Sequence, residues 1–595
     1  MRSSGVMNLE QHVGLQKVSA LAGLTLSSLG PCKAYKFIQE EEEEGGRSSG
    51  RAALVCSCLR LLESVQPSCA VGQLVSEAVR AHHAACGSGA GCLLFLAGAW
   101  SRAALECLRR GMAPLRVVGA MREGLDVCLQ ACRTHRVRLD TATEPRSPAL
   151  STEEDAARRT REHPRKGRGK VKLTHSRYFC GAAPDPASLV TPPSPPDVGP
   201  TARALSHGHD RSMELVLRVA RLQAVLDVGK VVTCVVPGVS EERACVSPGW
   251  VVRLPPEKVA VTRLLSGRSL RVALIAGDLC RRYRHPGFKT PQGLSHVTDR
   301  LDPGGSGEEG RWTDGVLTSL LRLGVDLLLV SGATDDSLSL RCLVHGILPV
   351  DRVRASVLQA FAEATGATAV TYAAQLSQRC VGAGAKVTPW RDLGERRAVI
   401  ISSEAGGGLA TVVLTGCVPA KLQSMEDEFW ACAHRLHGAL RDGAVLPGAG
   451  LIEVVCVRDL RKHARRPLKL PGEAEPEAGG LYRAEVLRLM ADGLMDYVAT
   501  VMANSGRCSK LEAWTEVSQK VERLDGLSGV LEDEKGPAVT SGDGAEGTVY
   551  DNLSVKVEAW TRAMDLVFLV LQTDAEIITG VDPETLRTQT DLMLL

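Results

Sequence analysis

Aromatic residues are scarce: Phe, Tyr and Trp make up only 4% of the 595 residues. Hydrophobic residues reach 44% and charged residues 23%, which are ordinary proportions for a globular protein and exclude a chain that is disordered throughout. The core must therefore be built mainly from Ala, Val and Leu. At about 150 residues per domain, the length predicts roughly three to five domains or one large multi-lobed fold.

The chain also lacks a large net charge, at +3, so we expect no nucleic-acid partner. Residues 1–15 contain Glu10, Gln11 and His12 where a signal peptide would need apolar residues. The longest apolar stretch, 90–100, is shorter than the about 20 residues that span a bilayer. These features predict a soluble protein with no membrane partner.

The 19 cysteines never form a CxxC pair. The nearest approach to a metal-binding pattern is Cys128, Cys132 and His135, which lacks the fourth ligand that tetrahedral zinc normally needs. We therefore expect buried, reduced thiols, no metal site and a cytoplasmic compartment.

Hydrophobic periodicity predicts helices near the N-terminus. Apolar residues recur at helical spacing at Val71, Leu74, Val75, Ala78 and Val79. The glycine-rich segment 86–91 interrupts the pattern, and a second helix is predicted over 93–110 with Gly111 as its stop. His82 and His83, at the end of the first helix, are expected to cap it or to face solvent.

Residues 136–205 differ in composition from the rest. Segment 158–177 is strongly basic and segment 184–200 is rich in proline, so this stretch cannot bury enough apolar surface to become ordered. We predict a disordered insertion that acts as a solvated linker. A nucleic-acid or nuclear-import role is the weaker alternative, because no aromatic residues interleave with the charges. The charged runs 40–44 and 532–547 are predicted to be loops.

From about residue 230, short apolar runs bounded by Gly, Asp and Arg predict buried strands. These runs are 272–275, 325–330, 350–353, 398–401 and 410–414. A helix is predicted over 356–365 and a surface loop over 302–310. The alternation of strands and helices indicates an α/β module in the middle of the chain.

The last part of the chain is helical again. One helix is predicted over 421–440, and a final helix carries apolar residues on one face at Leu553, Val557, Trp560, Met564, Val567, Phe568 and Leu571. This order predicts a helical domain that is made from both chain ends and encloses an inserted middle.

Five motifs in this order resemble the group II chaperonins, the CCT and thermosome family. Leu29-Gly30-Pro31 with Lys36 resembles the phosphate loop TLGPKGMDK, and 87–91 resembles the loop GDGTT. The other three are 343–367, similar to the apical stretch that ends in AxATGA; 447–450 with Glu453, similar to VPGGGAxE; and Tyr550-Asp551 with Lys556 and Trp560, similar to the closing helix. The resemblance covers most of the chain outside the insertion.

The resemblance implies an α+β multidomain fold, the group II chaperonin fold. It has a helical equatorial domain from both termini, a small intermediate hinge domain and an inserted α/β apical domain. The expected boundaries are 1–135 and 444–595 for the equatorial domain, 136–205 for the insertion, 206–239 and 410–443 for the intermediate domain, and 240–409 for the apical domain. The family's apical lid helix falls on 281–312, where dense Pro and Gly predict that it is short or missing.

The resemblance also implies a nucleotide pocket, lined by Gly30, Pro31, Gly87, Gly89, Gly448, Gly450 and Asp551. The family's metal-holding Asp falls on Ser88, and its two threonines fall on Ala90 and Gly91. The Asp that orients the attacking water falls on Ala431, and no carboxylate occurs from 429 to 441. Asp427 and Glu428 lie about a turn earlier and are expected to face elsewhere.

Mg²⁺ prefers anionic oxygen ligands, which a serine hydroxyl does not replace. We therefore expect a protein that is not an enzyme, with no catalytic residues and no certain cofactor. Weak ATP or ADP binding stays open, because backbone N–H groups at helix starts still hold phosphate. The alternative is that the glycines serve only backbone angles and close packing.

Segments 12–19, 94–101 and 559–580 resemble a divergent branch of the family, the vertebrate chaperonin-like proteins linked to Bardet–Biedl syndrome. This implies a helper in assembling the BBSome, the ciliary trafficking coat. The implied partners are CCT subunits, the related chaperonin-like proteins and BBSome subunits as clients. The implied location is cytoplasmic, with association to the centrosome, basal body and cilium. Two alternatives stay open: an active ATP-dependent chaperonin subunit, and a scaffold that uses its basic insertion.

Overall fold

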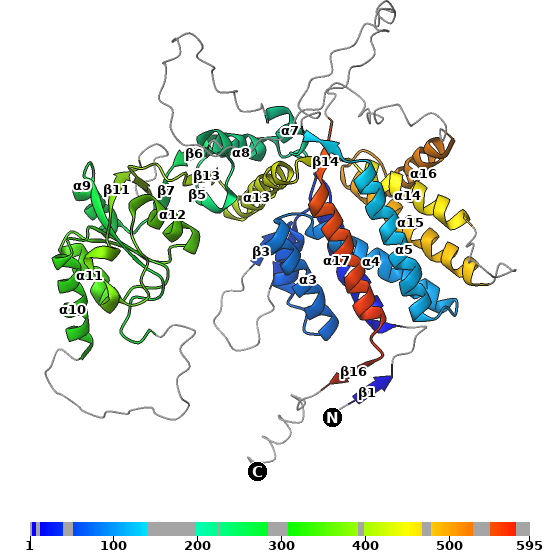
Figure 1. The fold of residues 1–595 in the computed structure, drawn as a ribbon, viewed down its shortest axis with the longest axis horizontal. Helices are drawn as coiled ribbons and strands as arrows, with labels where there is room; N and C mark the ends of the chain where they lie inside the picture. The colour runs from blue at the N-terminus through cyan, green and yellow to red at the C-terminus, as the bar shows by residue number, and fades with distance from the viewer. Residues whose placement is uncertain are drawn as a thin grey trace, which may run out of the picture.

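A helical body formed by both ends of the chain makes up one side of the molecule (Figure 1). This computed structural model describes residues 3–6, 12–39, 52–139, 198–223, 225–283, 308–390, 398–466, 478–526 and 548–578. The first half supplies α1 (Val13–Leu24), α2 (Cys58–Val65), α3 (Ala70–Cys86), α4 (Ala90–Arg109) and α5 (Pro114–Thr134). The second half supplies α14 (Leu451–Arg465), α15 (Ala478–Asn504), α16 (Lys510–Gly526) and α17 (Leu553–Leu571).

One hydrophobic core joins these two halves. Trp100 of α4 and Trp560 of α17 are both fully buried in it. By length and composition α4 is apolar enough to cross a membrane, but 78% of its most apolar 18-residue window is buried inside the protein. Such burial explains the high apolar content of α4, because a helix that is apolar all round must be covered on every side.

Short strands form three small sheets beside this helical body. β1 (Ser3–Val6) pairs with β16 (Ala575–Ile578), and β2 (Lys36–Gln39) pairs with β3 (Ala52–Val55), both antiparallel. A third small sheet has the order β15-β14-β4, from Tyr550–Asn552, Ala444–Pro447 and Val137–Arg138. Single-turn 3₁₀ helices occur at Leu26–Ser28, Val228–Lys230, Glu241–Arg243, Ala373–Gln375 and Gln378–Cys380.

A small middle region follows along the chain. Its parallel pair β5 (Val231–Pro237) and β13 (Ala410–Gly416) is extended by the antiparallel β6 (Cys245–Pro248). Helices α7 (Gly199–Ala204), α8 (Asp210–Gln223) and α13 (Pro419–Asp442) complete the region, with a core that is separate from that of the helical body.

The inserted α/β lobe lies at the far end of the molecule (Figure 1). Its six-stranded sheet has the order β10-β9-β8-β11-β12-β7, and β10, β9 and β8 are parallel. In chain order the strands are Trp250–Arg253 (β7), Leu270–Ile275 (β8), Leu327–Val330 (β9), Leu348–Val350 (β10), Gly382–Pro389 (β11) and Ala398–Ser403 (β12). The helices are α9 (Pro256–Leu265), α10 (Glu308–Arg322), α11 (Asp336–Val344) and α12 (Ala355–Thr365).

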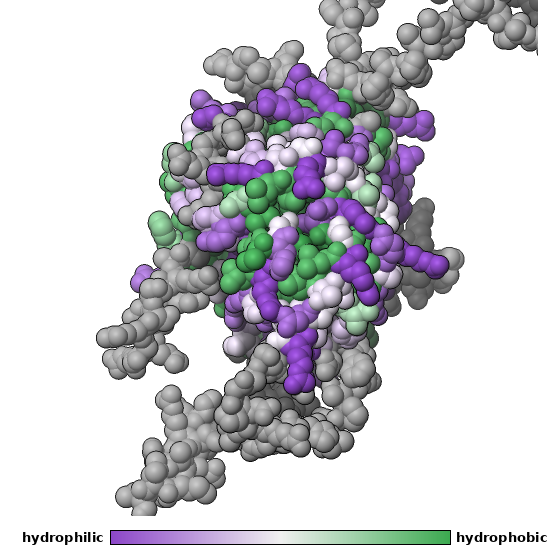
Figure 2. Space-filling view, turned by 90° about the vertical axis from the view of Figure 1, so that its left-hand side faces the viewer, coloured by the Kyte–Doolittle hydropathy of each residue, from purple (hydrophilic) through white to green (hydrophobic). Residues whose placement is uncertain are grey.

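This lobe exposes apolar side chains on its outer side. Figure 2 shows a hydrophobic area ringed by hydrophilic residues on the face that looks away from the helical body. Leu264 of α9 is 72% exposed, and Leu340 and Val344 of α11 are 62% and 77% exposed.

The structure differs from the sequence prediction near some of the expected boundaries. Within the segment 136–205, Val137–Arg138 forms β4 and Gly199–Ala204 forms α7, with Ala202 fully buried in the middle core. Residues 140–197 lie outside the described part. The predicted domain boundary at 240 is also displaced, because β6 pairs with β13 of the middle sheet and the lobe sheet begins at Trp250.

Smaller differences concern the ends of elements. The loop predicted over 302–310 gives way to α10 at Glu308, and the strand predicted over 350–353 is Leu348–Val350. The second helix begins at Ala90 rather than at 93, because Gly89 takes the positive φ that starts it. The runs 40–44 and 532–547 and most of the predicted lid segment, 284–307, lie outside the described residues.

Candidate functional site

The three glycine loops that the sequence singled out meet in the helical body. The first loop contains Gly30, the second is 87–91 and the third is 447–450. A Cβ on Gly91 would lie 2.9 Å from Leu29, so the first and second loops touch. Gly30 packs on Val501 and Gly450 on Val498, one turn apart on α15. Because i and i+3 residues share a helix face, the first and third loops lie next to each other.

The segment before α17 and the first turn of that helix pack against the second and third glycine loops. A Cβ on Gly448 would lie 2.9 Å from Val549, and one on Gly89 would lie 2.7 Å from Val555. Pro31 lies against the turn at Gly208. The predicted glycines therefore surround one place, and each has its α-carbon packed against protein atoms. That packing, with the positive φ of Gly30, Gly87, Gly89 and Gly450, accounts for glycine at these positions.

Two helices begin at this place. Gly89 precedes α4 and Gly450 precedes α14, and neither helix has a side-chain cap. An uncapped helix start presents unpaired N–H groups and a partial positive charge, which favour an anion.

A buried ion network lies beside these helix starts. Lys556 donates to Glu453 Oε1 and to Asp551 Oδ2, at 2.6 Å each. His207 Nε2 lies 3.1 Å from Asp551 Oδ1 and 2.7 Å from the Tyr550 carbonyl oxygen. The side chain of Lys556 is 9% exposed and that of Glu453 is fully buried.

The network fixes the charge of its members. Burial opposes ionisation of Asp551, but the Lys556 ammonium lowers its pKa below the usual range. Burial likewise opposes the charge on Lys556, and the carboxylates of Asp551 and Glu453 raise its pKa well above the usual value. Asp551, predicted to line a nucleotide pocket, is thus engaged by a buried lysine and a histidine.

Buried polar atoms in and beside the loop 87–91 lack hydrogen-bond partners among the described residues. They are Ser88 Oγ in the loop and both ring nitrogens of His82 in α3. His82 was predicted to cap a helix or face solvent, which is wrong: it is fully buried. The spacing of i+3 from Val79 puts it on the apolar stripe of α3. Burial lowers the pKa of His82 to about 4, so the ring is neutral at pH 7.

Helix α13 turns one face toward the helical body. Asp427 makes two 2.7 Å hydrogen bonds with Arg60 of α2. His434 packs on Gly87, where a Cβ would lie 2.1 Å from the His434 Cγ atom. Asp442 accepts a 3.0 Å hydrogen bond from the Ser554 N–H. The spacing of i+4 from Asp427 and i−3 from His434 puts Ala431 on this same face.

Asp427 and Glu428 were both expected to face elsewhere, which is wrong for Asp427: it lies on the same face as Ala431 and is paired with Arg60. Glu428 does face elsewhere. It lies 3.4 Å from His209 Nδ1, in the middle region, and accepts a hydrogen bond from Ser424. The face of α13 that lies against the loops therefore has Ala431 where a carboxylate would be needed to orient water.

Ser88 and Ala431 offer no anionic oxygen for a magnesium–nucleotide complex, and Mg²⁺ favours carboxylate ligands. Asp551 and Glu453 already neutralise Lys556. Among the described residues, no group of three or more His, Cys, Asp and Glu side chains could hold a metal ion. The helix starts alone would attract an anion.

The three residues nearest to a metal-binding pattern, Cys128, Cys132 and His135, lie in different surroundings. Cys128 and Cys132 are fully buried in the core beside Cys456, which donates a 3.7 Å hydrogen bond to the Cys128 carbonyl oxygen. His135 lies at the exposed end of α5. Burial raises the pKa of Cys456 well above its ordinary value, so this thiol stays protonated.

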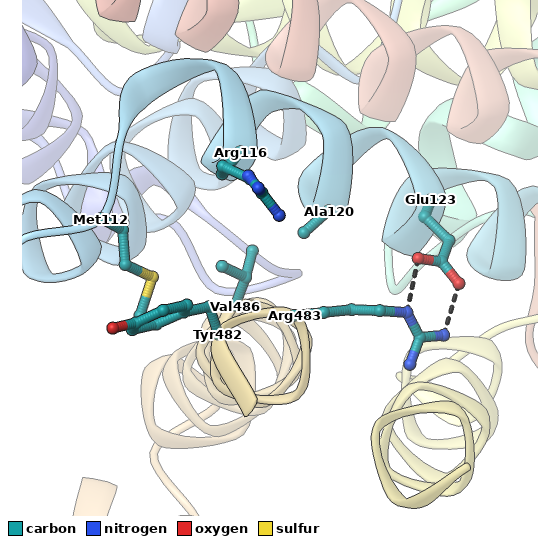
Figure 3. Close-up of a pocket in the computed structure, with 7 residues that line it drawn as sticks. All are labelled: Met112, Arg116, Ala120, Glu123, Tyr482, Arg483 and Val486. Atoms are coloured by element: carbon teal, nitrogen blue, oxygen red, sulfur yellow. Dashed lines mark hydrogen bonds and ion pairs between the residues drawn. The ribbon is translucent and has the colours of Figure 1, made fainter. Parts of the chain in front are cut away.

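A cavity of about 190 Å³ lies between α5 and α15 (Figure 3). Its lining is Met112, Arg116, Ala120, Glu123, Tyr482, Arg483 and Val486, and none of these is a predicted site residue. The Arg483–Glu123 ion pair forms one end of it (Figure 3). This cavity is therefore separate from the glycine loops.

Sequence reasoning missed the roles of Lys556, His207 and His434. One signal was available for Lys556: it lies i+3 from Leu553 and i−4 from Trp560, on the apolar face of its helix. A lone cation on such a face indicates a buried partner. No comparable signal marks His434, because its contact with Gly87 joins distant parts of the chain.

A helical body built from both chain ends, a small middle sheet and an inserted α/β lobe define the chaperonin fold. The model of the TCP-1/cpn60 chaperonin family matches residues 306–580. The "Chaperonin-containing T-complex member BBS12" of Mus musculus is 32% identical over 97% of both chains, and the protein of that name from Xenopus laevis is 28% identical over 96% of this chain and 97% of its own. "Thermosome subunit alpha" of Aeropyrum pernix is 24% identical over 45% of each chain. The chain belongs to the TCP-1/cpn60 chaperonin family, which supports a chaperonin-like role.

Proposed function

We propose that this chain is a chaperonin-like assembly factor that does not hydrolyse ATP. The observation that carries this proposal is the absence of a carboxylate at Ser88, in the loop 87–91, and at Ala431, on α13. The carboxylates of Glu453 and Asp551 nearby are paired with Lys556. Phosphoryl transfer depends on a bound metal and an oriented water, and neither has an anionic partner here.

The proposed client is the BBSome, and the proposed partners are CCT subunits and related chaperonin-like proteins. The relatives in mouse and human are named as members of a chaperonin-containing T-complex, which supports CCT subunits as partners. The exposed apolar side chains of α9 and α11 are a suitable contact surface, because a large apolar area on a folded protein commonly marks an interaction site. The proposed location is the cytoplasm, at the base of the cilium.

A turnover assay tests the first part. The purified chain should release phosphate from ATP no faster than buffer, and Ala431→Asp alone should not restore turnover because Ser88 remains neutral. Turnover above background in the unmodified chain would favour the active chaperonin subunit instead.

Affinity capture from ciliated cells tests the second part. Recovery of CCT and BBSome subunits is expected with the full chain and after deletion of 158–177. Loss of both partners on that deletion would favour a scaffold that uses its basic insertion.

A further inference from the structure

Helix α13 contacts the helical body along most of its length. The contact residues are Asp427, His434, Gly438 and Asp442, with Ala431 between the first two; their spacing of i, i+4, i+7, i+11 and i+15 is one face of a helix. From Asp427 to Asp442 this face spans about 22 Å at 1.5 Å per residue.

Side chains and backbone groups of the body contact this face at both of its ends. At one end, Asp427 is paired with Arg60, and its carboxylate is 24% exposed. At the other end, Asn552 donates a 2.8 Å hydrogen bond to the Arg435 carbonyl oxygen and packs on Gly438. Arg441 donates a 3.2 Å hydrogen bond to Ser554 Oγ, beside the Asp442 contact.

His434 fills the centre of the contact. Its ring lies over the α-carbon of Gly87, stacks loosely with Trp430 at a centroid distance of 6.0 Å, and is half-buried. A residue with any β-carbon at Gly87 would collide with it. The imidazole thus occupies the space between α13 and the loop that precedes α4.

We propose that α13 is held docked on the helical body by the chain's own side chains, with His434 as the positioning residue over Gly87, so that docking needs no nucleotide. The inference deepens the proposed function, because it states how the same site is regulated: a helix that is already docked is not driven through a nucleotide cycle.

Hydrogen exchange of the full-length chain tests this, followed by mass spectrometry on peptides that cover 86–91 and 427–442. In the unmodified chain, Mg-ATP or Mg-ADP should leave the exchange of both segments unchanged. Protection that increases several-fold with either nucleotide would overturn the inference, and this comparison needs no variant.

Variants then test whether His434 is responsible for the protection of both segments. His434→Ala should speed exchange in both segments about tenfold, the equivalent of a modest local opening free energy. His434→Phe keeps a planar ring over Gly87 and should retain protection. His437→Ala is the matched control, because its ring lies 3.2 Å from the Leu226 carbonyl oxygen in the middle region rather than against the body. Unchanged exchange in a folded His434→Ala protein would also overturn the inference.

The hydrogen-exchange experiment and the turnover assay can fail independently of each other. ATP hydrolysis by the unmodified chain would refute the proposed function whatever the exchange data show. Exchange that depends on nucleotide without turnover would refute only the docking inference.

Discussion

Two residues near the glycine loops are under unusual local constraint. Ala449 has a φ of +53° between Gly448 and Gly450, a left-handed conformation that costs an L-residue about 1–2 kcal/mol. His82 is buried and neutral with both ring nitrogens unpaired among the described residues. Both features are tolerated because the surrounding packing fixes them, and both have measurable consequences.

Replacing Ala449 with glycine should stabilise the helical body. The left-handed strain of about 1–2 kcal/mol disappears, and the greater freedom of glycine in the unfolded chain offsets about 0.5–1 kcal/mol of that gain. Urea unfolding followed by hydrogen exchange of peptides from the helical body should show a gain of about 0.5–1 kcal/mol. Ala81→Gly, at an exposed position inside α3, should instead lose about 1 kcal/mol. A loss for Ala449→Gly would show that its φ is not strained.

Acid should weaken the helical body through His82. Its pKa in the folded protein is about 4, below the unfolded value of about 6.5, so the unfolded chain takes up the proton first. Stability is therefore complete above pH 6.5 and is lost as the pH falls toward 4; by pH 5 this one group removes about 2 kcal/mol.

The test compares urea unfolding at pH 7 and pH 5. The difference should shrink by about 2 kcal/mol in His82→Gln, which does not titrate, and should stay unchanged in His345→Gln, at an exposed position of the lobe. An identical pH dependence in His82→Gln and the unmodified chain would contradict this account.

At the scale of elements, the Lys556 network joins three segments of the helical body. Glu453 belongs to the first turn of α14, Asp551 to β15, and Lys556 to α17. β15 pairs with β14, which leads directly into α14, so the network closes a ring of elements around the helix starts. Removal of one partner of a buried pair leaves an uncompensated charge, which is the costly case.

Lys556→Met should therefore destabilise the helical body by about 3–5 kcal/mol, because it leaves Glu453 and Asp551 unpaired in the interior. Adding Glu453→Gln and Asp551→Asn should recover much of that loss, since neutral amides need no counter-ion. Lys510→Met removes the exposed pair with Asp496 and should change stability by less than about 1 kcal/mol. Equal effects of Lys556→Met and Lys510→Met in urea unfolding would refute the structural role of the network.

At the scale of the whole molecule, the lobe presents an apolar area on its outer side (Figure 2). The helical body has a hydrophobic core separate from those of the lobe. Contacts with partners through the lobe should therefore be separable from the stability of the body.

A double variant, Leu340→Glu with Val344→Glu, tests this separation. Both side chains are exposed, so unfolding should change by less than about 0.5 kcal/mol, whereas recovery of CCT and BBSome subunits in affinity capture should fall about tenfold. Leu511→Glu, at an equally exposed position of α16 in the helical body, should leave capture unchanged. Full recovery with the double variant would move the contact surface away from α11.

Much of the fold follows from periodicity. The strands at 272–275 and 398–401 and the helix α12 with its stop at Gly366 agree with the structure, because each has a local apolar pattern and a local terminator. The elements β4 and α7 at the edges of the predicted insertion were not predicted, because they are short and acquire their stability from distant partners.

The site was less accessible from the sequence. The glycine motifs located the loops, but the contacts that decide their chemistry are non-local: His434 with Gly87, and Lys556 with Glu453. Asp551 and Lys556 stand in the same sequence motif, but the motif does not indicate that their side chains form a buried ion pair. Such pairings depend on how elements meet, which a local pattern does not contain.

The helical body draws its core from the two ends of the chain, and this has a consequence during synthesis. The apolar helix α4 emerges from the ribosome early, while α17, which covers it, follows more than 440 residues later. At about 5–20 residues per second, α4 waits roughly 20–90 s for its cover. During that interval the face of α4 that packs on α17 has no cover, and a stop codon anywhere before Leu553 would release a product in which this face stays exposed.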